Sequence, residues 1–294
     1  MHSAESRGPT PELKPLPDAE SPCTIQKLFD VIDSNSIVQE DMDFILDRTG
    51  AFLSEDRGRA EQVVDTAKFR HWLVHRGASM LLVHGDYDIA DYPEISPLST
   101  LCVTLMQALQ TQPGFVSLAF FCGRHLSQQG IRNPGASDMM RSFIEQLLRQ
   151  CPSACPDTLG SEISLDEIEK GNLDHLIRLF TALIHRLPTS MTLMMFIDGV
   201  YLYERRKYCE ELYEVIDMLV KMVESEESMQ STVKILLTSQ QETRTRELNG
   251  AFRSRNAILS MRSMHDTGHG PSRSGGANRI AKEISNASES IDEE

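Results

Sequence analysis

Residues 80–100 read MLLVHGDYDIADYPEISPLST, and this stretch decides the fold class. Its first part, residues 80–84, is a short apolar run that ends at Gly85, which is typical of a strand buried on both faces. A polar loop follows over residues 86–96. Residues 98–109 then carry apolar side chains at helical spacing, with hydroxyl residues near the start, and predict a helix.

The alternation of strand and helix signals continues along the chain. Short apolar runs recur, and helical periodicity returns between them. Strands that alternate with helices predict parallel βαβ units with right-handed crossovers, so we expect an α/β fold with a parallel sheet. Further strands are expected at 116–122, 191–197 and 233–238, and further helices at 139–150, 173–186 and 210–223.

Residues 23–77, ahead of this sheet, predict a small helical module. Apolar side chains at helical spacing indicate its helices. Trp72, the one tryptophan of the chain, is expected in the core. The expected helices are 24–32, 41–48 and 60–74.

The two ends of the chain have a different composition. The lead, residues 1–22, is rich in proline, which blocks both helix and strand. The tail, residues 265–294, is polar and glycine-rich and ends in acidic residues. Such segments bury too little apolar surface to offset their ordering entropy, so both are expected to be disordered. The sheet-containing domain is therefore expected at residues 78–264.

The formal net charge of −14 restricts the class of partner. Nucleic acids and anionic membrane surfaces are bound by clustered Lys and Arg, so neither is expected here. No stretch approaches the roughly 18 apolar residues of a membrane span, and the lead lacks a secretory signal, so we expect a cytoplasmic protein. The six cysteines lack the paired spacing of a zinc site, and no metal site is expected on that ground.

Three predicted strands end in residues suited to a ligand site. In open parallel sheets, ligands bind at the carboxyl ends of the strands. An apolar strand followed by a loop and a helix, and then a distant strand that ends in Asp, is the arrangement of a P-loop NTPase. The three strand ends read His84-Gly85, Asp198-Gly199 and Thr238-Ser239-Gln240.

Seven short phrases occur along the chain in a characteristic order and spacing: DMDFIL (41–46), KFRHWL (68–73), LLVHG (81–85), AFFC (119–122), MRSFIEQLL (140–148), MFIDG (195–199) and ILLTS (235–239). With them the chain resembles the NACHT-like P-loop domains of fungal STAND-type proteins, the group with nephrocystin-like N-terminal domains. The resemblance covers about residues 29–264. It implies a P-loop NTPase fold whose loop would hold a nucleotide with magnesium.

The loop after Gly85 departs from the family pattern Gly-x-x-x-x-Gly-Lys-[Ser/Thr]. If Ser99 and Thr100 match the hydroxyl pair, Leu98 stands at the lysine position and Pro97 at the glycine position. Proline removes a backbone N–H from the phosphate cradle, and leucine removes a cation. Four carboxylates in the same loop repel a polyphosphate. We therefore expect no triphosphate binding in the usual manner, and no bound cofactor.

Other candidate site residues follow from the resemblance. Asp198 would help to hold magnesium together with Ser99, although a strand-end Asp also serves simply as a turn residue. Glu204 is a shifted candidate for the second acidic residue that positions the attacking water. Ser239 lies at the fourth strand end, and Gln240 stands where the family has arginine.

Three functions remain open from the sequence. The first is a degenerate STAND-like module, a pseudo-NTPase that acts on other proteins as a scaffold or regulator. The second is a weak ATPase or GTPase that uses Ser99, Thr100 and Asp198 for magnesium and borrows a cation from Arg124 or Arg141. The third is a nucleotide sensor without turnover.

Overall fold

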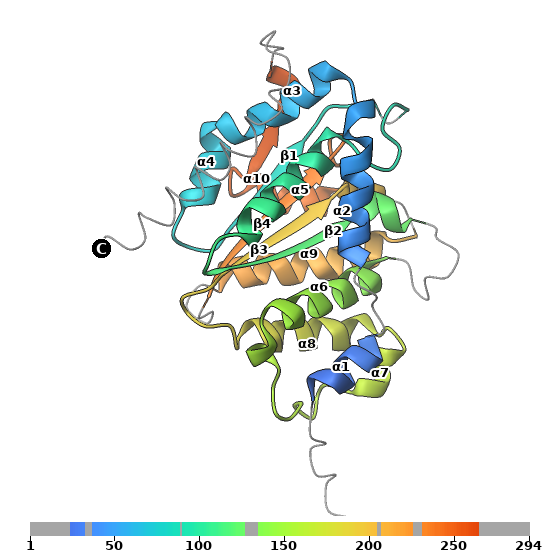
Figure 1. Cartoon of the computed structure of the whole chain (residues 1–294), viewed down its shortest axis with the longest axis vertical. Coiled ribbons are helices and arrows are strands. Elements are labelled where there is room, and N and C mark those ends of the chain that lie inside the picture. The colour runs from blue at the N-terminus through green and yellow to red at the C-terminus, as the bar shows by residue number, and fades with distance from the viewer. Residues whose placement is uncertain are drawn as a thin grey trace, which may run out of the picture.

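The fold is described by a computed structural model that covers residues 24–32, 37–88, 90–126, 135–204, 207–225 and 231–264. The two ends that are expected to be disordered, residues 1–22 and 265–294, lie outside the described residues. The described chain has a sheet in the middle and helices on both of its faces (Figure 1).

Five strands of the described chain form one sheet, and all neighbouring strands are parallel. Their order across the sheet is β2-β3-β4-β1-β5, so each connection crosses over a face of the sheet. This confirms the prediction of a parallel α/β fold. The strands are β1 (Ser79–His84), β2 (Phe115–Phe121), β3 (Thr192–Asp198), β4 (Thr232–Ser239) and β5 (Ile258–Ser260).

The sheet lies in the middle of the fold because the side chains of β1 to β4 are mostly apolar and buried on both faces. Successive residues of a strand point to opposite faces. In β3, Met195 and Ile197 belong to the apolar cluster on one face, and Met194 and Phe196 to the cluster on the other. All of these residues are buried.

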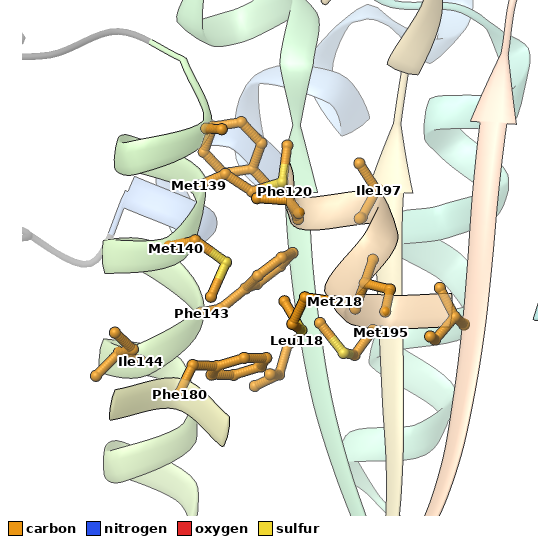
Figure 2. Packing of buried hydrophobic residues seen from close by; sticks show 14 of the residues in the cluster. Leu118, Phe120, Met139, Met140, Phe143, Ile144, Phe180, Met195, Ile197 and Met218 are labelled. Carbon is orange, nitrogen blue, oxygen red and sulfur yellow. The ribbon is translucent and has the colours of Figure 1, made fainter. Parts of the chain in front are cut away.

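Helices cover the two faces in separate groups. One face carries α1, α6, α7, α8, α9 and α10, and the other carries α2, α3, α4 and α5. On the first face, Phe143 of α6 stacks on Phe180 of α8 with ring centroids 5.9 Å apart, in front of Leu118 of β2 (Figure 2). The helices are α1 (Ile25–Ile32), α2 (Ile37–Arg48), α3 (Ser54–Gln62), α4 (Ala67–Val74), α5 (Pro97–Gln110), α6 (Ala136–Gln150), α7 (Leu165–Glu169), α8 (Leu173–Ile184), α9 (Cys209–Glu224) and α10 (Arg246–Arg253).

The helix expected over residues 60–74 is two helices in the structure. α3 ends at Gln62, and a 3₁₀ turn, Val63–Asp65, separates it from α4. Thr66 caps α4, because its side-chain oxygen accepts a hydrogen bond from the Phe69 amide. Trp72 lies in α4 and is 3 % exposed, so the prediction of a core tryptophan is confirmed.

The outer edge of β2 is covered by two glutamines of α6. Gln146 accepts from the Ala119 amide at 2.9 Å and donates to the Ala119 carbonyl at 2.8 Å. Gln150 likewise accepts from the Ser117 amide at 3.0 Å and donates to the Ser117 carbonyl at 2.7 Å. The two glutamines are four residues apart in the helix, a rise of about 6 Å, and Ala119 and Ser117 are two residues apart in the strand, a rise of roughly 6.6 Å. The spacing of the glutamines therefore matches the spacing of the backbone groups that they bind. An exposed edge is a template for pairing with another chain, and here it is closed.

Replacing Gln146 by leucine is expected to lower the free energy of unfolding by roughly 2 kcal/mol. The substitution leaves the buried N–H and C=O of Ala119 without partners, and these groups cannot reach water. Denaturant unfolding measures the loss. The control is Gln107→Leu on the exposed side of α5, which should change stability by less than about 0.5 kcal/mol. Equal stabilities of the two variants would contradict the role assigned to Gln146.

Candidate functional site

The carboxyl ends of β3, β4 and β1 lie side by side, because these strands are neighbours in the sheet. His84 is in register with Ser239, and the Gly85 amide donates to the Ser239 carbonyl at 2.8 Å. Gly199 follows Asp198 with a φ of 73°, a left-handed conformation that glycine adopts without strain. The chain therefore turns away directly after Asp198, whose side chain remains at this edge.

Asp198 is bonded to two hydroxyl groups. Ser99 Oγ donates to Oδ2 of Asp198 at 2.6 Å, and Thr238 Oγ1 donates to Oδ1 at 2.5 Å. All three residues are buried, with exposed fractions of 1 % or less. The structure thus brings Ser99 and Asp198 together, as the resemblance implied. Thr238 was missed as a site residue, because nothing in a strand-end Thr-Ser pair tells which hydroxyl points to the aspartate.

Burial sets the protonation of this carboxyl group. Desolvation raises the pKa of Asp198 to about 6, and the hydrogen bonds from Ser99 and Thr238 act in the opposite direction. A carboxyl group with this pKa is ionised near neutral pH at a cost in free energy. No ammonium or guanidinium group donates to Asp198 among the residues that the structure describes.

The first turn of α5 provides its own hydrogen-bond partners. The Leu98 amide donates to the Ser96 hydroxyl oxygen at 3.2 Å, and the Ser96 amide donates to Ser99 Oγ at 2.9 Å. The Ser99 amide donates to the Ser96 carbonyl, and Pro97 has no N–H. Helix N-termini bind phosphate through free amides of the first turn. In α5 the cap made by Ser96 occupies these amides.

Side chains fill the space above Gly85. Leu98 is fully buried, and Tyr87 is 4 % exposed. A Cβ atom at Gly85 would lie 2.5 Å from the Tyr87 ring and 3.1 Å from Cδ1 of Leu98. The Tyr87 amide also donates to the Gln240 carbonyl at 2.8 Å, which fixes the loop beside the end of β4. Leu98, which stands at the expected lysine position if Ser99 and Thr100 match the hydroxyl pair, thus makes an apolar contact.

Arg59 of α3 is a cation that the sequence did not indicate at this site. Its Nη2 donates to the Gly85 carbonyl at 3.0 Å, and its Nη1 pairs with Asp56 at 3.2 Å. Asp56 also accepts a hydrogen bond from the Tyr92 hydroxyl at 2.7 Å. These contacts fasten the loop to α3. No sequence signal could have found them, since Arg59 and Asp56 form an ordinary surface pattern on a helix.

The other predicted site residues lie in different contacts. Thr100 Oγ1 is 3.4 Å from Thr49 Oγ1, and Ser239 Oγ donates to the Gln241 carbonyl at 2.5 Å. Glu204 accepts from the Thr245 amide and hydroxyl and from the Arg244 amide, at the start of α10.

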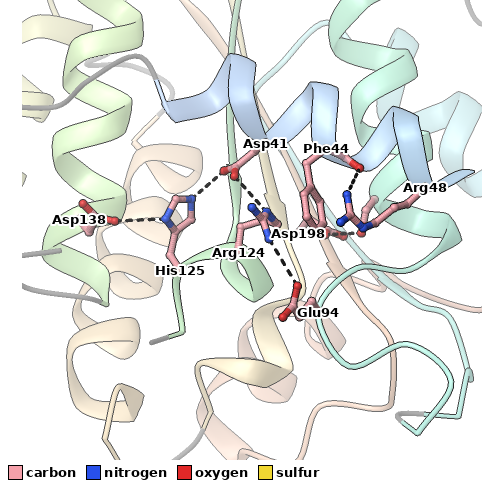
Figure 3. Close-up of polar contacts among 9 residues, drawn as sticks. Asp41, Phe44, Arg48, Glu94, Arg124, His125, Asp138 and Asp198 are labelled. Carbon is pink, nitrogen blue, oxygen red and sulfur yellow. Dashed lines mark hydrogen bonds and ion pairs between the residues drawn. The ribbon is translucent and has the colours of Figure 1, made fainter. Parts of the chain in front are cut away.

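The two arginines that were considered as borrowed cations also have other partners. Arg141 donates to four carbonyls, those of Val31, Ile32, Ile168 and Glu169, at the ends of α1 and α7. Arg124 pairs with Asp41 and Glu94 (Figure 3).

A cavity of about 720 Å³ opens beyond the ends of β1, β4 and β5. It is lined by both acidic and basic side chains. Asp198 and Ser99 are not among its lining residues. Those residues are Asp86, Tyr87, Asp88, Gln241, Glu242, Thr243, Arg244 and Arg262.

A family model, nephrocystin 3, N-terminal, matches residues 58–240, which is more than half of the chain. The chain belongs to this family. Its family domain begins within α3 and ends directly after β4, so it contains β1, α5, β3 and the Asp198 cluster. The helices α1 and α2 precede the matched residues. The resemblance to nephrocystin-like N-terminal domains is thereby confirmed over residues 58–240, a shorter range than the expected 29–264.

A comparison with curated proteins finds no match. Among the described residues, none of the helices has the length and apolar character needed to span a bilayer.

Proposed function

We propose that this chain is a non-catalytic member of the nephrocystin 3 N-terminal family that acts through contacts with other proteins, as a scaffold or regulator. One observation supports the proposal: protein atoms fill the space after β1, where the phosphates of a nucleotide lie in a P-loop NTPase. Leu98 and Tyr87 pack over Gly85, and the Ser96 cap occupies the amides of α5. A nucleotide would have to displace both side chains and open the cap.

The electrostatics of the loop support the same function. Asp86 and Asp88 follow Gly85, and Glu94 precedes α5. The Arg59 guanidinium is already shared between Asp56 and the Gly85 carbonyl. Two further cations beside the loop also pair with carboxylates already, Arg124 with Glu94 and Arg262 with Asp86. A triphosphate brought to this loop would have to compete with these carboxylates for the cations, and repulsion of several kcal/mol, as an order of magnitude, would oppose binding.

The residues around Asp198 do not fit a magnesium ion in this arrangement. Mg²⁺ demands octahedral oxygen coordination and keeps several water ligands. Both carboxylate oxygens of Asp198 already accept hydrogen bonds from Ser99 and Thr238, and the three side chains are buried. We derive no metal-dependent step for this cluster.

A second candidate function, a weak ATPase or GTPase, is favoured by one specific observation. The structure brings Ser99 of α5 to Asp198 of β3 at the carboxyl edge of the sheet, which is the pairing that the family loop requires. A nucleotide sensor without turnover would use the same pair. Both functions require the loop to rearrange around the ligand.

Thermal unfolding with millimolar Mg-ATP or Mg-GTP separates these functions. A ligand at about 100 times its dissociation constant adds roughly 2.7 kcal/mol of stability, which raises the melting temperature by several degrees. We expect no rise beyond that of Mg²⁺ alone, because the cradle is filled. A rise with turnover that Asp198→Ala abolishes would instead establish the NTPase, and a rise without turnover would establish the sensor.

A further inference from the structure

The helix α2 packs against the matched domain but precedes the matched residues in the chain. It covers Ile37–Arg48, whereas the matched family residues begin at 58. It packs against α5 and the end of β2 (Figure 1). Three of its side chains are buried there, those of Asp41, Met42 and Ile45. The surface that receives α2, which we call the α2 groove, is therefore formed by matched residues, whereas α2 itself lies before them in the chain.

A buried carboxylate lies at the centre of this contact. Asp41 is 3 % exposed and accepts from His125 Nε2 at 2.7 Å and from Arg124 Nε at 3.3 Å (Figure 3). His125 stacks on Phe120, with ring centroids 4.6 Å apart. On its other side, His125 Nδ1 lies 3.6 Å from Oδ2 of Asp138 in α6. The groove thus presents two basic side chains, Arg124 and His125, that together bind one acidic side chain of a helix.

Apolar anchors flank this carboxylate. Met42 and Ile45 lie in the apolar cluster that also contains α5 and one face of β2. Positions three or four apart share a helix face, so Asp41 and Ile45 enter the groove together. Phe44 lies between two guanidinium groups, with the Cζ atoms of Arg48 and Arg124 each 3.4 Å from its ring centroid. The groove therefore accommodates a short sequence pattern in a helix: an acidic residue, as Asp41, with apolar residues one and four positions later, as Met42 and Ile45.

The physical character of the contact makes α2 replaceable. A buried ion pair adds little net stability, because desolvation offsets attraction, but it fixes register. An isolated helix of 12 residues is marginal in water, so α2 depends on its groove for its own stability. Its opposite side is exposed and carries Asp43 and Asp47. A partner helix with the same pattern would make the same contacts.

We propose that the α2 groove is a docking site for an acidic amphipathic helix of a partner protein, and that α2 is its intramolecular occupant. Charge complementarity defines the partner: Arg124 and His125 require a carboxylate at the position of Asp41. α2 covers the groove until a competing helix displaces it. This inference rests on the proposed scaffold function and names the surface that such a function uses.

Peptide binding to the full chain tests the proposal. The probe is a fluorescein-labelled peptide of residues 37–48, IVQEDMDFILDR, followed by fluorescence anisotropy. The apparent affinity of a groove falls with the fraction of molecules in which it is open. Asp41→Ala in the chain weakens the internal occupant, so this variant should bind the peptide at least about tenfold more tightly than the wild type. A peptide that itself carries Asp41→Ala should not bind either chain.

One control lies on the exposed side of α2, and a second variant tests the groove independently of Asp41. Asp43→Ala, in the chain or in the peptide, removes an equal charge from an exposed position and should leave binding unchanged. Met42→Ala in the chain loosens α2 while keeping Asp41, and should increase peptide binding in the same direction. Both chain variants must retain a cooperative unfolding transition.

Three outcomes would overturn the proposal. The first is a folded Asp41→Ala chain that binds no peptide, and the second is equal binding of the native and substituted peptides. The third is dimerisation of the wild-type chain through exchanged α2 helices, which would make a second copy the occupant. The assay contains no nucleotide, so its failure is separate from that of the scaffold function, which a melting shift with Mg-ATP would refute.

Discussion

Replacing Lys234 by methionine is expected to lower the free energy of unfolding by about 3 kcal/mol. Lys234 lies in β4 and is 3 % exposed. Its Nζ donates to the Trp72 carbonyl at 3.1 Å, to Ser79 Oγ at 3.0 Å and to the His75 carbonyl. These carbonyls are at the end of α4, where the last C=O groups of a helix lack partners and carry negative partial charge. One ammonium group thus joins α4 to two strands.

Two effects oppose each other in this substitution. Methionine removes the cost of burying a charge, which by itself favours the variant. It also removes the charged donor from three acceptors: the buried Trp72 carbonyl, which keeps a hydrogen bond from Ser79 Oγ at 3.3 Å, and the partly buried Ser79 Oγ and His75 carbonyl. Hydrogen bonds to charged groups contribute roughly 1.5–3 kcal/mol each, and less where water can replace the donor. The second effect is larger because three hydrogen bonds are lost at once, and methionine, which has a similar length, supplies no donor in their place.

Denaturant unfolding of Lys234→Met measures this effect. The matched control is Lys221→Met in α9, where an exposed lysine pairs with Asp217 one helical turn away. Exposed pairs of this kind contribute about 0.3–0.5 kcal/mol, so the control should remain close to the wild type. Similar stabilities of Lys234→Met and Lys221→Met would show that α4 does not depend on the buried ammonium.

Asp198→Asn is expected to stabilise the protein at neutral pH, by an amount that grows with pH. Burial raises the pKa of Asp198 from 3.8 to about 6, and a shift of this size corresponds to about 3 kcal/mol. The folded state therefore favours the protonated carboxyl group. Its contribution to stability is fully present below about pH 4 and is lost as the pH rises through 6. Asparagine resembles the protonated form and does not titrate.

The difference in unfolding free energy between Asp198→Asn and the wild type isolates this group from all others that titrate. We expect it to be near zero at pH 4 and close to its full value at pH 8. Asp47→Asn on the exposed side of α2 is the control and should stay within about 0.5 kcal/mol at every pH. A difference that does not change between pH 4 and 8 would mean that Asp198 is ionised in the folded state without cost.

Much of the fold could be predicted because its signals are local. The apolar runs of β1 to β4 are buried on both faces, and helical periodicity marks the long helices. β5 could not be predicted, since its three residues, Ile258–Ser260, are too short to show a period. The single helix predicted over residues 60–74 failed because Thr66 competes for the backbone and begins a new helix there.

The candidate site was only partly predictable. Ser99 and Asp198 could be paired from the family arrangement, and the structure places them 2.6 Å apart. Arg59 and Thr238 could not be found, because their contacts at the site depend on how α3 and β4 pack beside the loop. The sequence predicted Ser239 as the site residue of this strand, but its neighbour Thr238 is the one that contacts Asp198. Adjacent strand residues face opposite sides of the sheet, so only one of the two can reach the aspartate.

The sequence by itself determined the parallel α/β class and the absence of a lysine before Ser99, since both follow from residue type and local period. Only the tertiary structure decided which distant groups meet: Lys234 with the end of α4, and Asp41 with His125. A polar side chain shows its chemistry in the sequence. The packing of the folded chain determines which group it bonds to, because a buried polar side chain can bond only to groups within hydrogen-bonding distance.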